Sequence, residues 1–181
     1  MQGVSDEGGE PERLREGDPA TWEAFYERVY PMMLAYSQRR LGYNELARDA
    51  VSEALARTVT TVSRMAELGT TPEAWSFGIL RHVVVDEQRK SYRDRHVRDS
   101  AVVAPADPSE SVSIHDEHAN VRQAFARLSD FDRELLELRV VAGLSSEEVA
   151  TALEMKPGAV RMAQSRALER LRKLMPGEAQ S

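Results

Sequence analysis

The strongest constraint on the fold lies in residues 144–175, LSSEEVATALEMKPGAVRMAQSRALERLRKLM, which predict two helices separated by a sharp turn. Ser145 and Glu148 have the spacing of a capping box, which satisfies free N–H groups where a helix begins. Pro157 cannot continue that helix but suits the first turn of the next one, and Gly158 leaves room for close packing. A helix, a turn of about four residues and a second helix are typical of a helix-turn-helix motif.

The second of these helices has an apolar side and a basic side when its residues are placed about 100° apart. The apolar side holds Val160, Ala163, Ala167, Leu168, Leu171 and Leu174. DNA-reading proteins place the first turns of such a helix on base edges, and nearby basic residues hold phosphates. The candidate base readers are Arg161, Ser165 and Arg166, and the candidate phosphate contacts are Arg170, Arg172 and Lys173. A plain amphipathic helix in a helical bundle is the alternative interpretation.

The N-terminal half also carries apolar residues at helical spacing, and none of its segments alternates as a strand does. We expect residues 1–16 to be disordered, because glycine, proline, serine and acids leave almost nothing to bury. Asp18 and Pro19 predict a helix start, and Pro31 should kink or divide the helix that follows. A second long helix is expected over residues 46–65. Thr71 and Pro72 predict the start of a third.

A linker divides the chain into two helical domains. Residues 99–118 are rich in proline, serine, alanine and acids and show no helical spacing, so we expect a flexible tether. The domains on either side span residues 17–98 and 119–176, and residues 177–181 form a tail. Within the second domain, Ser129 predicts a helix start and Gly143 a helix end.

Charge is distributed unevenly along a chain whose formal net charge is −6. Six Lys or Arg residues fall between positions 81 and 98, and six more fall between 156 and 173. Residues 99–120 hold five acids and no Lys or Arg. Two basic segments on either side of an acidic one indicate two contacts with one polyanion, although charged runs often only solvate a helix face.

Composition excludes several classes of site. The chain has no cysteine, which rules out disulfides, thiolate zinc sites and cysteine nucleophiles. No apolar run is long enough to cross a bilayer, and the N-terminus lacks the apolar stretch of a secretion signal. We therefore expect a soluble cytoplasmic protein without a membrane partner.

Residues 128–175, LSDFDRELLELRVVAGLSSEEVATALEMKPGAVRMAQSRALERLRKLM, resemble conserved region 4 of bacterial sigma factors of the extracytoplasmic-function (ECF) group. The resemblance implies a domain that binds the minus-35 promoter element. Residues 17–98 resemble region 2 of the same group. The implied fold is all-α, with two small helical domains joined by a flexible acidic linker.

Residues 47–58, ARDAVSEALART, resemble the region 2 segment that docks on the clamp helices of the largest catalytic subunit of core RNA polymerase. The docking residues implied by this resemblance are Asp49, Val51, Ser52, Glu53, Leu55 and Arg57. Ala50 and Ser52 stand where Leu and Gln are usual in the family. Taken without the resemblance, Asp49, Glu53 and Arg57 form a polar helix face with i, i+4 pairing.

Residues 74–90, AWSFGILRHVVVDEQRK, resemble the helix that engages the minus-10 element, with His82 where Asn is common. The preceding loop, residues 66–72, matches a family loop that takes in a flipped base. A freed strand needs a basic track and a site for an unstacked base. The implied minus-10 contacts are Thr70, Thr71, Trp75, Arg81, His82, Arg89, Lys90 and Arg93. A lone Trp in an apolar stripe is also typical of a core residue.

The resemblance predicts an alternative sigma factor that binds core RNA polymerase and directs it to promoters for transcription initiation. Its partners would be core polymerase and promoter DNA, and an anti-sigma factor is common in the group. A free-standing helix-turn-helix regulator that binds operators without polymerase is the alternative. We expect no cofactor and no enzymatic activity, because catalysis belongs to the polymerase. The segment HDEH, residues 115–118, has metal-ligand types but lies in the linker, where nothing fixes their geometry, so no metal is expected.

Overall fold

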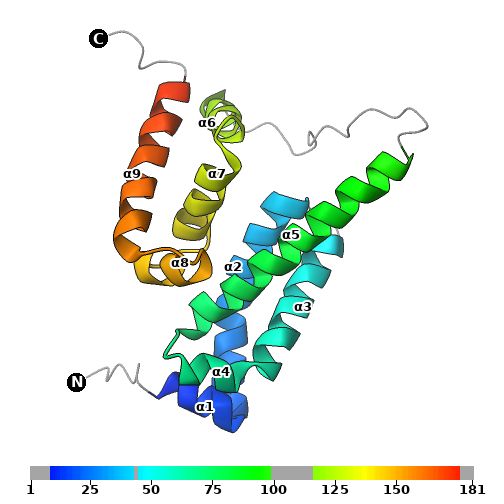
Figure 1. Ribbon diagram of the computed structural model, residues 1–181, viewed down its shortest axis with the longest axis vertical. Coiled ribbons are helices and arrows are strands. Elements are labelled where there is room, and N and C mark those ends of the chain that lie inside the picture. The colour runs from blue at the N-terminus through cyan, green and yellow to red at the C-terminus, as the bar shows by residue number, and fades with distance from the viewer. Residues whose placement is uncertain (1–8, 43–44, 99–115, 176–181) are drawn as a thin grey trace.

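The computed structural model describes residues 9–42, 45–98 and 116–175, and every regular element among them is helical (Figure 1). The N-terminal domain consists of α1 (Glu10–Glu16), α2 (Pro19–Leu41), α3 (Glu45–Thr60), α4 (Val62–Glu67) and α5 (Pro72–Arg98). The C-terminal domain consists of α6 (Asp116–Ala126), α7 (Asp130–Leu136), the π-helical turn η1 (Glu137–Val141), α8 (Ser146–Ala152) and α9 (Pro157–Leu174). The predicted all-α fold with two helical domains is confirmed.

Helix α1 corrects the expectation that residues 10–16 are disordered. Leu14 is buried, and its carbonyl accepts a hydrogen bond of 3.0 Å from Trp22 Nε1. Gly17 ends the helix at φ 78°, a conformation that favours glycine. Glu10 also binds Arg28 of α2 at 2.7 Å, so a buried leucine and an ion pair together order a segment that is polar by composition. Residues 1–8 lie outside the described residues.

Helix α2 begins where Asp18 accepts a hydrogen bond of 2.9 Å from the Thr21 N–H. It continues to Leu41 without interruption, so Pro31 does not divide it. A proline inside a helix costs about 3 kcal/mol. Buried residues on both sides of Pro31, including Phe25 and Met33, hold the two halves in one core and offset that cost.

The single helix predicted over residues 46–65 is two helices, α3 and α4, with a break at Thr61. The hydroxyls of Thr60 and Thr61 both donate to the Arg57 carbonyl, at 3.0 and 2.7 Å. Such bonds compete with the backbone ladder and bend helices. The spacing of apolar residues does not predict this break, because Val62 and Met65 keep the helical period and are buried.

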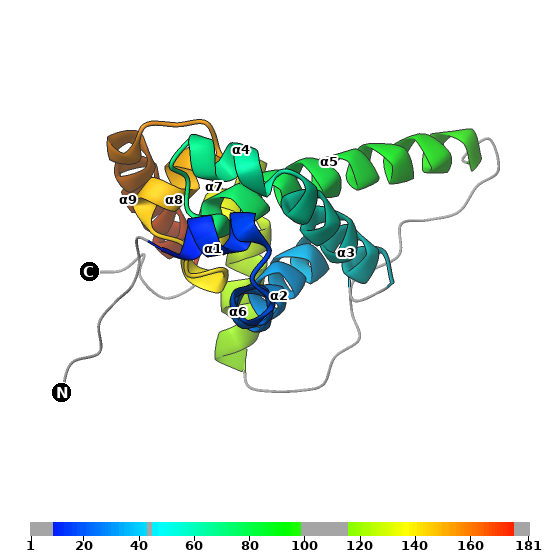
Figure 2. The ribbon, with the colours of Figure 1, turned by 90° about the horizontal axis from the view of Figure 1, so that it is seen from below.

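Helix α5 begins at Pro72, and the Thr71 hydroxyl accepts from the Ala74 N–H at 3.2 Å, as the sequence predicts. Its first half packs on α2 and α3 through Phe77, Leu80 and Val84, and its C-terminal end extends beyond the other helices (Figures 1 and 2).

The C-terminal domain contains the predicted helix-turn-helix. Both bonds of the capping box are present: Ser145 N donates to Glu148 Oε2 at 2.7 Å, and Glu148 N donates to Ser145 Oγ at 3.1 Å. Ser129 caps α7, and Gly143 follows η1 at φ 67°. The turn into α9 passes through Glu154, which adopts a left-handed φ of 55°. The capping box, the Ser129 cap and the Gly143 turn each act over a few residues, which is why the sequence predicted them, whereas the left-handed Glu154 was not predicted.

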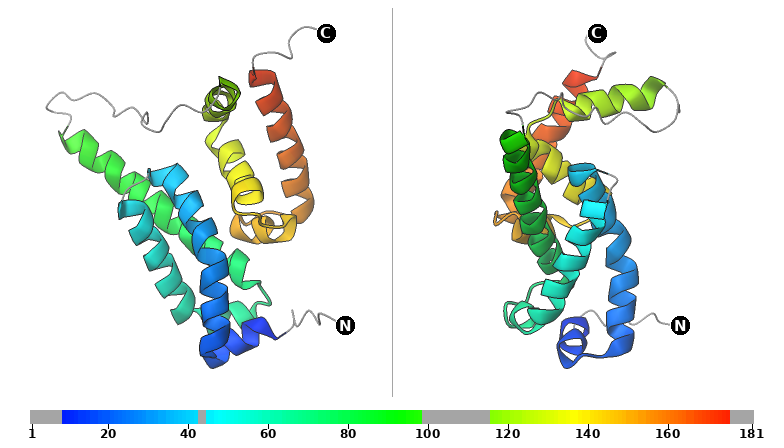
Figure 3. Two further views of the ribbon diagram at one scale, coloured as in Figure 1. Left: turned by 180° about the vertical axis from the view of Figure 1, so that it is seen from behind. Right: turned by 90° about the vertical axis from the view of Figure 1, so that its right-hand side faces the viewer.

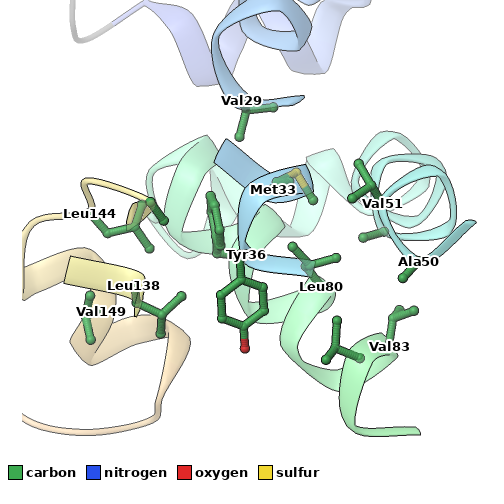
Figure 4. Packing of buried hydrophobic residues seen from close by; sticks show 14 of the residues in the cluster. Val29, Met33, Tyr36, Ala50, Val51, Leu80, Val83, Leu138, Leu144 and Val149 are labelled. Atoms are coloured by element: carbon green, nitrogen blue, oxygen red, sulfur yellow. The ribbon is translucent and has the colours of Figure 1, made fainter. Parts of the chain in front are cut away.

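The two domains pack against each other, an arrangement that the tether hypothesis did not include. Helix α8 lies against α5, and η1 lies against α2 (Figures 1 and 3). One hydrophobic core runs through both domains, and Figure 4 shows Tyr36 of α2 between Leu80 of α5 and Leu138 of η1. Residues 99–115 lie outside the described residues, so the flexibility of the linker stays a prediction.

Candidate nucleic-acid interface

Helix α9 presents its basic side to solvent. Val160 and Ala167 are buried on the opposite side, where α9 packs on α6, α7 and α8. The candidate base readers Arg161, Ser165 and Arg166 are all exposed, as is Met162 between them. An exposed thioether among polar groups offers apolar contact to a base edge, and Met162 was not among the residues predicted from the sequence.

Ion pairs distinguish the basic residues of α9. Arg161 pairs with Glu147 at 3.1 Å, and both side chains are largely exposed. Exposed pairs contribute little, so a phosphate or base can replace Glu147 at small cost. Arg166 and Arg172 make no side-chain hydrogen bond or ion pair within the part of the chain that the structure describes. Lys173 binds Glu169 at 2.8 Å, and this hydrogen bond lowers the pKa of the Glu169 carboxyl.

Arg170 also contacts α7, although its side chain is 56% exposed and its predicted phosphate contact stays a prediction. Its Nη1 lies 2.8 Å from both carboxylate oxygens of Asp132, a residue of α7 that is buried. Removal of one partner of a buried charge pair is costly. Arg170 therefore anchors α9 on α7, which the sequence did not indicate when it placed Arg170 among the phosphate contacts.

The second predicted basic surface lies on α5. His82, Arg89, Lys90 and Arg93 are exposed. His82, Arg89 and Arg93 share one face of the helix at i, i+7 and i+11. Arg89 and Lys90 lie 3.8 and 3.6 Å from Asp86 and Glu87, which are long, exposed pairs that leave both cations accessible.

Trp75 packs as a core residue rather than as an open stacking platform. Its ring is half-buried against the main core, and its Nε1 donates to Thr61 Oγ1 at 2.9 Å. The alternative interpretation of this tryptophan is therefore favoured.

The face of α3 toward solvent is polar, with acids in a small majority over arginines. Asp49, Ser52 and Glu53 are exposed, and Arg57 binds Glu53 at 2.7 Å, one helical turn away. Val51 does not belong to this face: it is fully buried in the core, so it positions α3 and cannot contact a partner. Leu55 is half-buried.

Leu46 is an exposed apolar residue two turns before Glu53 on the same face of α3. It completes a surface in which an apolar group lies beside carboxylates. The sequence predicts a helix over residues 46–65 but does not indicate that Leu46 faces solvent, because its spacing fits the apolar stripe of that helix.

No group of His, Asp or Glu side chains that could hold a metal is found among the described residues. The side chains of His115 and His118 fall outside them. The helices that the structure describes include none long and apolar enough to cross a membrane.

Two family models match the chain: Sigma-70 region 2 over residues 25–94, and Sigma-70, region 4 over residues 118–171. The ECF RNA polymerase sigma factor ShbA of Streptomyces griseus is 35% identical over 176 residues, covering 90% of this chain and 91% of ShbA. The chain belongs to the ECF family of RNA polymerase sigma factors. From here on, its N-terminal and C-terminal domains are called region 2 and region 4.

Further comparisons agree. The ECF sigma factor SigD of Mycobacterium tuberculosis is 34% identical over an alignment of 164 positions, and the match covers 86% of this sigma factor and 77% of SigD. The structure of the sigma factor RpoE of Bartonella quintana, solved with the anti-sigma factor NepR, superposes with a TM-score of 0.63 at 25% identity over 84% of this chain and 94% of that one. CnrH, solved with the cytosolic domain of CnrY, shares the fold at a TM-score of 0.61 and 17% identity, over 91% of this chain and 94% of CnrH.

A polar contact between regions 2 and 4 was not predicted. Glu134 Oε1 of α7 accepts hydrogen bonds from Tyr36 Oη at 3.1 Å and from Arg81 Nε at 3.0 Å. Arg40 lies 3.5 Å from Glu134 and 3.7 Å from Glu137, and all of these groups except Arg81 are nearly buried. Burial raises the pKa of Glu137, although Arg40 beside it acts in the opposite direction.

Two predicted minus-10 residues take part in contacts with region 4. Arg81 binds Glu134, as above, and the Thr71 hydroxyl donates to Glu148 Oε1 at 3.1 Å. Thr70, next to Thr71, is half-buried. The structure therefore divides the minus-10 candidates into exposed residues on the middle of α5 and two residues, Thr71 and Arg81, that bind side chains of region 4.

Proposed function

We propose that this sigma factor, mounted on core RNA polymerase, reads the minus-35 element with α9 and the minus-10 element with α5 and the loop before it. The observation that carries the proposal is the two-sided character of α9. Arg161, Ser165 and Arg166 are exposed on its first turns, while Val160 and Ala167 fix its other side. Arginine can donate two hydrogen bonds to one guanine, and serine can donate to or accept from a base edge.

For the minus-10 element, the face of α5 that carries His82, Arg89 and Arg93 is proposed to follow the freed strand. Exposed cations on one face of a long helix suit the backbone of a single strand. Thr70 and Thr71 are proposed to meet a base flipped from that strand.

Docking on the polymerase is proposed for the α3 face that carries Leu46, Asp49, Ser52 and Glu53. Acidic groups around one apolar residue suit a basic partner surface, where charge directs the encounter. The net charge of −6 also supports dependence on the polymerase. Binding to random DNA requires neutralisation of phosphates, and a negative net charge weakens it. An anti-sigma factor is a further proposed partner, since the similar RpoE was solved with one. We place the protein with polymerase in the cytoplasm.

In vitro transcription with core polymerase on genomic fragments tests the proposal. Initiation should require the sigma factor, and the isolated protein should not protect promoters at nanomolar concentration. A nanomolar footprint without polymerase would instead support a free-standing regulator.

Glu53→Lys tests the docking face. We expect binding to core polymerase to weaken about tenfold, which corresponds to about 1.4 kcal/mol. Glu23→Lys on α2, the same charge change at another exposed site, should leave binding unchanged. Equal affinity for both variants in a pull-down would remove α3 from the interface.

A further inference from the structure

We propose that Met162 makes α9 specific for thymine, by packing its thioether against the 5-methyl group of that base in the major groove. The inference rests on the proposed function, in which α9 reads the minus-35 element. It adds the identity of one base and the residue that selects it. Hydrogen bonds from arginine and serine do not supply this selection.

Met162 differs from the other large apolar residues of α9, because 58% of its surface is exposed. Val160 is buried, and three leucines are half-buried against the rest of region 4: Leu168, Leu171 and Leu174. An apolar side chain in water is stabilised when it meets an apolar partner. The exposure of Met162 therefore leaves apolar surface available to a ligand of α9.

Met162 lies where a recognition helix meets base edges. It is in the second turn of α9, and the N-terminal residues of such a helix contact bases in the major groove. Gly158 and Arg166 lie one turn before and one turn after it on the same stripe. Nothing lies within 4 Å of an added Cβ at Gly158, so this end of the stripe is open. A base edge can therefore approach Met162 over a residue that has no side chain.

The polar neighbours of Met162 supply hydrogen bonds but no apolar contact. Arg161 and Arg166 are donors only, and Ser165 can donate or accept. Guanine and thymine both present acceptors in the major groove, so these donors do not separate the two bases completely. The 5-methyl group is the apolar feature that only thymine presents there. Methionine is flexible and polarisable, so it can fill the space around that methyl group.

The spacing of Met162 and Arg166 also limits where the thymine lies. The two residues are one helical turn apart, which is about 5.4 Å along α9. Successive base pairs are about 3.4 Å apart. The thymine is therefore expected within about two base pairs of the guanine that Arg166 is proposed to bind.

Holoenzyme binding to promoter DNA with uracil in place of thymine tests the proposal, because uracil lacks only the 5-methyl group. Promoters come from transcription of genomic fragments by core polymerase with this sigma factor, and each upstream thymine is replaced in turn. One replacement should weaken binding by the parent about fourfold, which is the effect of one buried methyl group. The same replacement should leave binding by the Met162→Gln holoenzyme unchanged.

Two control variants separate a direct contact from an effect of the methyl group on DNA shape. Met162→Leu keeps an apolar side chain of similar size, so it should keep the preference for thymine over uracil. Val140→Ser, at an exposed apolar residue of η1, should keep it as well. Circular dichroism should show that all three variants fold as the parent does.

The outcomes separate this inference from the proposed function. Equal binding of thymine and uracil promoters by the parent, or equal sensitivity in the parent and Met162→Gln, would overturn the role of Met162 and leave α9 as the reader of the minus-35 element. Selected promoters that share an upstream element without thymine would overturn that role too. If scrambling the whole upstream element does not weaken binding by the parent, the proposed function itself fails.

Discussion

Regions 2 and 4 bury their apolar residues in different ways. Region 2 surrounds its own core, in which Val29 and Met33 of α2 lie with Val51 of α3 and Leu80 of α5 (Figure 4). Region 4 divides its apolar residues between two places. Leu128, Leu136 and Ala167 form a small core with α9, whereas Leu135, Leu138, Leu144 and Val149 join the core of region 2.

The two regions also supply different polar groups to the contact between them. Region 2 contributes the hydroxyl and guanidinium groups of Tyr36, Arg40 and Arg81, and region 4 contributes the carboxylates of Glu134 and Glu137. A small domain has little core of its own, so contact with a neighbour matters more to it. The comparison teaches that region 2 surrounds most of its apolar core with its own helices, whereas region 4 completes its interior on region 2.

The largest effect is expected where region 4 relies on region 2. Leu138→Ala should lower the free energy of unfolding by about 2–5 kcal/mol, because it leaves a cavity beside Tyr36. Val140→Ala, at an exposed neighbour, should change it by less than about 0.5 kcal/mol. Urea denaturation measures both. Similar small losses would mean that the regions are separate in solution and that the asymmetry does not exist.

The second effect sharpens the comparison at the DNA-reading surfaces. Arg166→Ala should lower the affinity of the holoenzyme for promoters with the preferred minus-35 sequence by about 1–3 kcal/mol. The reason is the loss of an exposed arginine that is proposed to donate two hydrogen bonds to a base. Arg64→Ala, an exposed arginine of region 2, should have little effect. Filter binding at fixed salt gives the affinities. Equal losses on scrambled upstream DNA would make Arg166 a phosphate contact.

A smaller effect is expected from pH at the contact between the regions. Burial raises the pKa of Glu137 in the packed state, where Arg39 and Arg40 of α2 and Arg133 and Glu134 of α7 surround it. A raised pKa stabilises the packed state below the ordinary pKa of Glu, and this stabilisation is lost as pH rises through the raised value. Glu137→Gln should flatten that decline in unfolding free energy, and Glu45→Gln at an exposed site should not. Parallel curves for Glu137→Gln and the parent would contradict the assignment.

The smallest effect lies within region 4. Glu154 holds a φ of 55°, where a side chain is strained. Glu154→Gly should raise stability by about 0.5 kcal/mol, because relief of strain exceeds the entropy that glycine adds to the unfolded chain. Gly143→Ala at φ 67°, with nothing within 4 Å of its Cβ, should lower stability by about 1 kcal/mol. Thermal denaturation that shows the same sign for both changes would contradict this account.

The sequence alone was sufficient for features that a few residues decide. The caps at Asp18, Thr71, Ser129 and Ser145 and the start of α9 at Pro157 all lie where they were predicted. A cap is satisfied within three residues of itself, so its signal is local. The basic side of α9 follows from helical period in the same way.

Other features depended on contacts between distant segments. Leu14 orders α1 only because Trp22 and the core receive it, and Val51 separates from Asp49 and Glu53 only because α2 and α5 cover one side of α3. The sequence predicted a helix at residues 47–58 but could not tell which residues of that helix would be covered.

By itself, then, the sequence determined an all-helical chain with a helix-turn-helix at one end, the second helix of which has one basic side. Only the tertiary structure decided that region 4 rests on region 2 and occupies Thr71 and Arg81. The physical reason is range: Tyr36 and Glu134, which meet in the buried contact, are 98 positions apart. No periodicity or cap predicts such a contact, because it depends on how the folded surfaces of regions 2 and 4 fit together.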